Sequence, residues 1–290
     1  MHPSFFHIFA HPEKAKPLIF TGGFEEGRWD NGFLCAEGED QMYPVVGGIP
    51  VFIPPWRQEQ AWPEWALNKI REEDIIAQNW RRERQLLDER SKLREFAMRL
   101  AKSDGLILDV ASGPGGGFVP MVLQLNAEAK ALMCDLSLGL LQEWQRFLAD
   151  KRTPNVSFAV FDATKMPLES DSMDAVSDLG GFDNIAGSMQ AIEQAYRVLK
   201  PGGTLFSVNG TVERDDFLKL PEEVRASWYN TIPLAFDGYL QAFEQVGFKE
   251  IENTLETERE LSPDEGGLPG EAAKYGVKLH VKQYCTEAVK

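Results

Sequence analysis

The chain has 290 residues, of which 43% are apolar and 11% aromatic, and its formal net charge is −15. This length and apolar content indicate one large globular domain with an extension, and no run reaches the roughly 18 apolar residues of a membrane span. Nucleic-acid binding depends on neutralising phosphates with basic side chains, so the acidic charge argues against an RNA or DNA partner.

The first hundred residues read as two short units. Residues 18–55 are rich in Gly and Pro and hold short apolar runs such as YPVVGGIPVFIPP, which predicts a small β-rich unit over residues 1–60. Residues 61–103 are predicted to form a helical linker. Apolar residues recur there at roughly helical spacing: Ile76, Trp80, Leu87, Leu93, Ala97 and Leu100. Trp80 could cover a ligand, although packing in the core is the favoured role.

From residue 104 to the end, apolar strand-like runs alternate with helical stretches. The expected strands are 106–110, 130–135, 156–162, 173–179 and 203–209, with helices at 137–150 and 188–200 between them. Such alternation predicts an α/β fold, a Rossmann-like doubly wound sheet with right-handed crossovers. The rest predicts a helix near 236–246, strands near 248–255 and 276–284, and long surface loops at 211–235 and 258–272.

A glycine-rich turn, LDVASGPGGG, follows the first of these strands. Gly113 and Gly115 permit close approach of the backbone to a ligand, and the second strand ends in Asp135, where a carboxylate can accept from both hydroxyls of a ribose. A dinucleotide site and an S-adenosylmethionine site share these two features. The turn and Asp135 therefore predict a nucleotide-type ligand without choosing between the two.

Three details favour S-adenosylmethionine. Asp109 ends the first strand, and a carboxylate facing the ligand there would repel a pyrophosphate but suit an ammonium and a sulfonium. The glycines do not follow the Gly-x-Gly-x-x-Gly spacing from an initial glycine. Asp162 and Ala163 end the third strand, where they can hydrogen-bond the exocyclic amine and a ring nitrogen of an adenine.

Residues 104–210 resemble a class I S-adenosylmethionine-dependent methyltransferase of the broad type-11 group, which includes quinone-biosynthesis methyltransferases. LDVASGPGGG resembles the first motif, MCDLS the ribose-binding segment with Leu136, FDATKMPLESDSMDAV the adenine segment, and AYRVLKPGGTLFSVN the helix, turn and fifth strand. The resemblance implies a seven-stranded, mostly parallel sheet with an antiparallel last strand. It also adds Asp178, at the end of the fourth strand, to the cofactor residues. Ala111 replaces a usual glycine, and we expect it to need no positive φ.

In this family the methyl acceptor lies near the end of the fourth strand, here DLGGFDN. Asp178 and Asp183 are the candidate catalytic residues, able to orient an amine or act as a base, although one could instead cap the next helix. Five aromatic residues could line an apolar acceptor but more often form core: Phe182, Trp228, Tyr229, Phe236 and Tyr239. We expect a small-molecule acceptor and no metal. A nucleic-acid methyltransferase, a non-catalytic cofactor-binding protein and an NAD-dependent dehydrogenase remain alternatives.

The N-terminal unit has a fainter resemblance to zinc ribbons that precede some methyltransferase domains. The four metal positions would fall on Phe20, Gly23, Cys35 and Gly38, of which only Cys35 could bind zinc. We therefore expect apolar packing from Phe20, Phe33, Tyr43 and Ile49 in place of a metal. The three cysteines (the other two are Cys134 and Cys285) are far apart and favour a cytoplasmic protein, as does the lack of a basic segment before the first apolar patch.

Overall fold

The computed structural model describes residues 1–54, 72–149, 153 and 155–290. A seven-stranded sheet forms the centre, in the order β10-β11-β9-β8-β5-β6-β7. Its strands are β5 (Leu106–Val110), β6 (Lys130–Asp135), β7 (Val156–Val160), β8 (Met173–Leu179), β9 (Leu199–Val212), β10 (Lys249–Glu260) and β11 (His280–Val289). Strands β5 to β9 pair in parallel, and β11 pairs antiparallel with both β9 and β10. The predicted mostly parallel sheet with an antiparallel last strand is confirmed.

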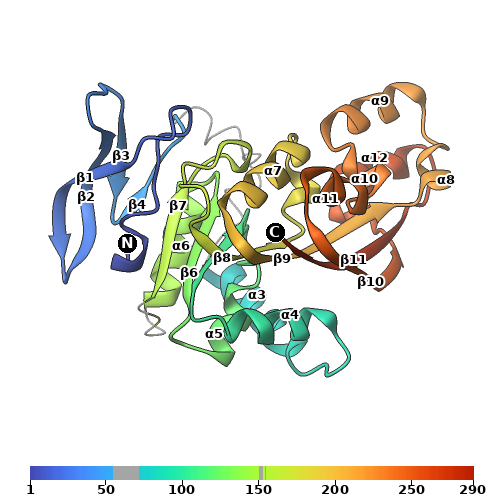
Figure 1. The fold of residues 1–290 in the computed structure, drawn as a ribbon. Helices are drawn as coiled ribbons and strands as arrows, with labels where there is room; N and C mark the ends of the chain where they lie inside the picture. The colour runs from blue at the N-terminus through green and yellow to red at the C-terminus, as the bar shows by residue number, and fades with distance from the viewer. Residues whose placement is uncertain (55–71, 150–152, 154) are drawn as a thin grey trace.

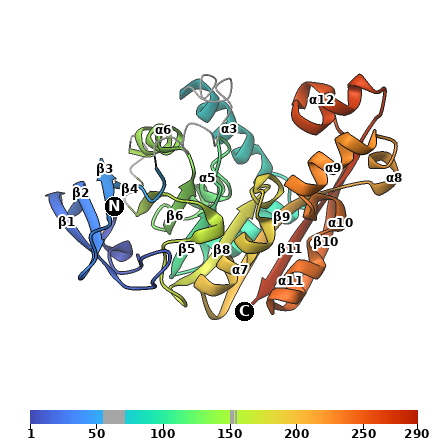
Figure 2. The same cartoon turned by 90° about the horizontal axis from the view of Figure 1, so that it is seen from above.

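Helices cover both faces of this sheet, as Figure 2 shows: α7 and α11 lie on one face, and α3, α5 and α6 on the other. Their bounds are α3 (Glu72–Gln85), α4 (Lys92–Ala101), α5 (Val119–Leu125), α6 (Leu138–Ala149), α7 (Ser188–Val198) and α11 (Leu240–Val246). Short 3-10 turns are η1 (Pro3–Phe5), η2 (Ala163–Lys165), η3 (Phe182–Asn184) and η4 (Pro263–Glu265). The strands of the parallel region are almost entirely buried, because helices shield them on both sides.

The N-terminal unit is an antiparallel sheet placed beyond the β7 edge of the central sheet (Figure 1). It consists of β1 (Leu18–Glu25), β2 (Arg28–Ala36), β3 (Met42–Val46) and β4 (Ile49–Pro50). Val51 bridges to Val160 at the end of β7, so the unit continues that edge. Its core is aromatic: the Trp29 ring stacks against Phe20 and Phe6 at centroid distances of 4.7 and 4.8 Å.

The expected packing of this unit is only partly right. Tyr43 and Ile49 are buried, but Phe33 is 47% exposed, and Trp29 takes the central place. Trp29 and Phe33 both lie on β2, four residues apart. Phe33 pairs with Thr21 of β1 on one side and with Pro44 of β3 on the other. Whether the unit descends from a zinc ribbon stays a prediction.

The expected apolar face of the first linker helix is wrong. In α3, Ile75 and Asn79 are buried, whereas Ile76 and Trp80 are 38% and 61% exposed, and Leu87, in the turn after α3, is 79% exposed. Trp80 therefore does not join the core, and it lines neither of the two cavities described below. The buried face lies one residue away from the apolar pattern. In α4 the pattern holds, since Leu93, Ala97 and Leu100 are buried. Residues 55–71, the end of the predicted N-terminal unit and the start of the predicted linker, lie outside the described residues.

The two long loops expected near the C-terminus are largely helical. Residues 211–235 hold α8 (Arg214–Phe217), α9 (Glu222–Thr231) and the start of α10 (Leu234–Asp237), and residues 258–272 hold η4 and most of α12 (Gly267–Lys274). Because these segments are polar and interrupted by prolines, their sequence shows no helical pattern of apolar residues. They are held together by a separate small core formed by Val212, Phe217, Leu220, Val224, Phe236, Leu268, Ala272 and Leu279.

Candidate active site

A cavity of about 960 Å³ lies at the carboxyl ends of β5, β6, β7 and β8. Seven of the residues expected to bind the cofactor line it: Ala111, Gly113, Gly115, Asp135, Leu136, Asp162 and Ala163. Parallel strands place their carboxyl ends at one edge of a sheet, which explains why segments far apart in sequence meet here. Asp109 and Asp178 do not line this cavity, contrary to expectation.

The glycine-rich turn is held from both sides. The amide of Gly113 donates to Oδ2 of Asp135 over 3.1 Å, and the amide of Ser137 donates to Oδ1 over 3.0 Å. Behind the turn, the buried indole of Trp144 donates to the carbonyl of Gly113 over 3.0 Å. Asp135 therefore fixes the turn as well as facing the cavity.

Asp109 supports the turn from beneath instead of facing the ligand. Its buried carboxylate accepts from the Ser177 hydroxyl (2.6 Å), the Ser112 hydroxyl (2.7 Å) and the amide of Phe118 (3.1 Å). A Cβ at Gly117 would lie 1.9 Å from Oδ2 of Asp109, so only glycine fits there. Burial raises the pKa of Asp109 to about 6, opposed by these three hydrogen bonds. The carboxylate therefore holds the glycine-rich turn in place, and its role toward a cofactor stays a prediction.

Ala111 departs from expectation in its backbone. Its φ is 48°, in the left-handed region, and the residues with positive φ that follow it in the turn are Gly113, Gly116 and Gly117. Gly115 is not among them; it is instead a place of close approach, since a Cβ there would lie 2.8 Å from the Arg82 guanidinium. The chain thus winds tightly under Ala111, which carries the strain that a glycine would avoid.

Asp162 and Ala163 line the cavity after the end of β7. Oδ1 of Asp162 accepts from the amide and the hydroxyl of Thr164 over 2.9 and 2.8 Å, which starts the turn η2. The Asp162 side chain is buried, and the neighbouring Ala163 is 7% exposed. Both residues remain candidates for reading an adenine ring.

Asp178 and Asp183 lie beside the cavity and below its surface. Oδ1 of Asp178 accepts from the amides of Gly181 and Phe182 over 2.7 and 3.0 Å, and its Oδ2 accepts from the Ser207 hydroxyl over 2.8 Å. These bonds fix the loop after β8. Burial, reinforced by the nearby Asp183 charge, raises the pKa of Asp178.

Asp183 is less completely bound. Its Oδ2 accepts from the amide of Gly210 over 2.8 Å, while the buried Oδ1 has no hydrogen-bond partner among the described residues. Burial raises the pKa of Asp183 to about 6, although the Gly210 amide and the adjacent Tyr239 hydroxyl pull it down. Gly181 and Asn184, on either side of Asp183, line the cavity.

Arg82 on α3 is a cavity residue that sequence reasoning missed. Its guanidinium donates to Oε1 of Gln85 over 3.0 Å and lies 3.4 Å from the carbonyl of Gly115. It forms no ion pair with a described residue, and burial lowers its pKa to about 10. The basic composition of residues 61–103 was the available signal, but the apolar pattern pointed to the wrong helix face.

Comparison with known proteins identifies the central region. Residues 107–203 match the sequence model of the methyltransferase domain family. A demethylmenaquinone methyltransferase of Paenarthrobacter aurescens is 35% identical over 99 residues, which cover 34% of this chain and 36% of that protein. A ubiquinone/menaquinone biosynthesis C-methyltransferase of Methylococcus capsulatus is 25% identical over 155 residues, covering 53% and 61%. The chain thus spans between about a third and three fifths of these relatives' length.

Solved structures agree at the level of the fold. Phosphoethanolamine N-methyltransferase 2 of Haemonchus contortus, in complex with S-adenosyl-L-methionine, matches with a TM-score of 0.55 and 16% identity, covering 86% of this chain and 62% of that one. The YcgJ protein of Bacillus subtilis matches with a TM-score of 0.52 and 15% identity, covering 68% and 97%.

Proposed function

We propose that this chain, whose residues 107–203 form a class I methyltransferase domain, transfers a methyl group from S-adenosylmethionine to a small molecule. The observation that carries the proposal is the single cavity in which the glycine-rich turn, Asp135 and Asp162–Ala163 meet. Its volume of about 960 Å³ leaves room for an acceptor beside a nucleoside-sized cofactor.

The cavity residues fit the proposed cofactor in chemistry. Asp135 supplies a carboxylate for the ribose hydroxyls, Asp162 and Ala163 supply an acceptor and an amide for the adenine, and the turn offers a close backbone. Arg82 supplies a cation for the carboxylate of the methionine part. S-adenosylmethionine brings an activated methyl group, so the protein has mainly to align the acceptor and exclude water.

The two aspartates beside the cavity take different roles in this proposal. Asp178 is a positioning residue, because its carboxylate is occupied by two amides and a hydroxyl. Asp183 is the candidate proton acceptor, because it lies between the cavity residues Gly181 and Asn184 and its raised pKa of about 6 is close to neutral. Proton removal is needed only for a hydroxyl or carbon acceptor.

The acceptor is proposed only as a small molecule. The curated relatives are named for demethylmenaquinone or for ubiquinone and menaquinone biosynthesis, but the first of them covers only 34% of this chain, and the helices α8, α9, α10 and α12 lie outside residues 107–203. The net charge of −15 disfavours a nucleic acid. We also propose a cytoplasmic location, since Cys134 and Cys285 are buried thiols without a disulfide. In the described residues no helix has the length and apolar character needed to cross a membrane.

The test is a calorimetric titration of S-adenosylhomocysteine, and separately of NAD, into the wild type. We expect the first to bind and NAD not to bind. Asp135→Asn should weaken S-adenosylhomocysteine at least about tenfold, as expected for losing a charge-assisted hydrogen bond, and the exposed Asp104→Asn should leave its affinity unchanged. Binding of NAD in its place would make the protein a dehydrogenase candidate, and binding of neither would overturn the proposal.

A further inference from the structure

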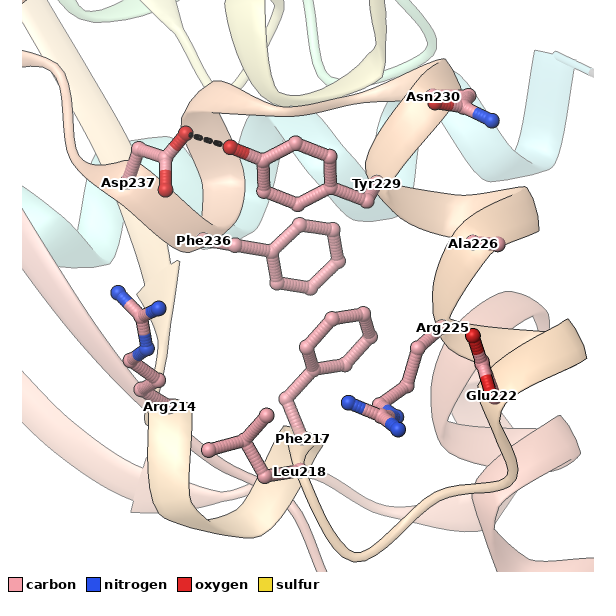
Figure 3. A pocket seen from close by; sticks show the side chains of 10 residues that line it. All are labelled: Arg214, Phe217, Leu218, Glu222, Arg225, Ala226, Tyr229, Asn230, Phe236 and Asp237. Atoms are coloured by element: carbon pink, nitrogen blue, oxygen red, sulfur yellow. Dashed lines mark hydrogen bonds between the residues drawn. The ribbon is translucent and has the colours of Figure 1, made fainter.

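A second cavity, of about 400 Å³, lies among α8, α9 and α10, beyond the carboxyl end of β9. Figure 3 shows its two cationic side chains, Arg214 and Arg225, on opposite sides of the Phe217 ring, with Phe236 and Tyr229 above it. None of its lining residues is shared with the larger cavity, and it falls outside the matched methyltransferase domain. It is therefore a site of its own.

The apolar part of the cavity is built from aromatic rings. Phe217 and Phe236 are buried and stacked, with ring centroids 3.9 Å apart and an angle of 17° between the planes. Tyr229 lies nearly parallel to Phe236 at 6.1 Å and is 43% exposed. Rigid, nearly parallel rings of this kind favour a flat apolar ligand over a flexible polar one.

The two arginines that line the cavity are, with Lys249, the basic residues of 211–275 that form no ion pair with a described residue. Residues 211–275 contain 6 basic and 15 acidic residues, so carboxylates are plentiful. Five cations of the C-terminal region each pair with one: Lys219, Arg259, Lys274, Lys278 and Lys282. Arg214 and Arg225 form no ion pair with any residue that the structure describes.

Two carboxylates, Asp237 and Glu222, also line the cavity. Asp237 accepts from the hydroxyl of Tyr229, as the dashed line in Figure 3 marks. Glu222 occupies the first turn of α9, where the helix dipole favours a negative charge. Nε of Arg225 donates to the carbonyl of Leu220 over 3.0 Å, which holds its side chain in place and leaves its terminal nitrogens toward the cavity. Arg225 therefore offers its terminal nitrogens as donors to an anion.

We propose that this second cavity binds a small aromatic carboxylate, with its ring against the aromatic wall of Phe217, Phe236 and Tyr229 and its anionic group attracted by the positive charges of Arg214 and Arg225 on either side of Phe217. A cavity of about 400 Å³ suits a ligand of one or two fused rings. The inference does not depend on the identity of the ligand in the larger cavity.

The probe is 2-naphthoate, with 2-naphthamide as its neutral counterpart, titrated by calorimetry into the full chain. We expect 2-naphthoate to bind and 2-naphthamide to bind at least about tenfold more weakly, because the amide lacks the charge that the arginines recognise. Arg214→Gln should weaken 2-naphthoate by about tenfold, and Lys219→Gln, which removes an equal charge outside the cavity, should not. Arg225→Gln is the second variant, and its melting temperature reports whether loss of the Leu220 contact disturbs the fold.

Three results would overturn the proposal: no binding of 2-naphthoate up to about 5 mM, equal binding of the amide, or unchanged affinity in Arg214→Gln. A 5 mM limit corresponds to roughly 3 kcal/mol of binding free energy, too little for a built site. Saturating S-adenosylhomocysteine is the remaining control. If it displaces 2-naphthoate while Arg214→Gln binds normally, the probe occupies the larger cavity and the second site is rejected.

Discussion

Ala111 opens the glycine-rich turn with a left-handed backbone, at a place where its methyl group also faces Gly181. A Cβ at Gly181 would lie 2.8 Å from the Ala111 methyl, so the two positions share the space of one side chain. An L-residue other than glycine pays of order 1 kcal/mol for such a φ. Alanine is thus compatible with the site, because Gly181 has no side chain to clash with its methyl group and the cost of its positive φ is small.

Ala111→Gly should therefore stabilise the protein. Relief of the positive φ outweighs the added freedom of glycine in the unfolded chain, and we expect the free energy of unfolding to rise by about 0.5–1 kcal/mol in urea titrations. Gly113→Ala, at a φ of 57°, is the matched opposite change and should destabilise by about 1 kcal/mol or more. A less stable Ala111→Gly would show that the methyl group contributes packing that exceeds the strain.

Arg82 gives the cofactor site a residue-level test that separates binding from structure. If its guanidinium binds the methionine carboxylate, Arg82→Gln should weaken S-adenosylhomocysteine by about tenfold or more and leave 5′-methylthioadenosine, which lacks the amino-acid part, unchanged. Isothermal calorimetry measures both. The exposed neighbour Arg81→Gln serves as control. Equal weakening of both ligands would assign Arg82 only a structural contact with the turn at Gly115.

The raised pKa of Asp183 should make the stability of the protein depend on pH. Its pKa is about 6 in the folded protein and about 4 when unfolded, so the native state binds more protons between these values and stability falls as pH rises through them. The full effect is about 2–3 kcal/mol above pH 6 for a two-unit shift. Asp183→Asn should therefore gain stability over the wild type at pH 8 and lose that advantage at pH 4.

Urea unfolding at the two pH values measures this difference. The pKa of Asp109 is also raised to about 6, so its contribution to stability likewise falls as the pH rises. The Asp183→Asn variant should therefore keep part of the pH dependence. The exposed Asp104→Asn should keep the wild-type profile. An Asp183→Asn profile parallel to that of the wild type would mean that its carboxyl group is solvated in solution, and it would remove the argument for Asp183 as a base.

At the scale of elements, the sequence predicts the parallel region well and the additions poorly. Strands such as 106–110, 130–135 and 173–179 agree with β5, β6 and β8 residue for residue, because buried parallel strands are short, continuous apolar runs. The cavity residues Gly113, Asp135 and Asp162 follow from those strand ends. The helices α8, α9 and α12 are polar and short, and their burial depends on one another, so no local pattern reveals them.

The same reasoning explains the errors in the site. Asp109 does stand at a strand end, but sequence cannot show that Ser112, Ser177 and the amide of Phe118 would enclose its carboxylate. Arg82 depends on how α3 is rotated about its axis, and the rotation is set by the burial of Ile75 and Asn79. The direction in which the Asp109 and Arg82 side chains point is thus set by tertiary packing, which the local sequence pattern does not contain.

At the scale of the whole molecule, the N-terminal unit and the central domain share one core. Trp29, Leu34 and Tyr43 belong to the same buried cluster as Leu108 and Val110 of β5. The backbone crosses the boundary as well: the amide of His2 donates to the Ser157 hydroxyl over 2.8 Å, and the amide of Phe52 donates to the carbonyl of Val160 over 2.8 Å. Residues 1–54 are therefore packed against the central domain through a shared buried core.

A shared core predicts that the two parts unfold together. Cooperative unfolding follows when separating the units would expose apolar surface on both, at about 25 cal/mol for each Å². We expect a single calorimetric transition, with calorimetric and van't Hoff enthalpies in a ratio near 1. Hydrogen exchange read by mass spectrometry supplies the local measurement: amides of β2 and β6 should lose protection at the same urea concentration. Exchange of β2 at lower urea, with β6 still protected, would instead make residues 1–60 a unit that opens independently and could uncover the β7 edge of the domain.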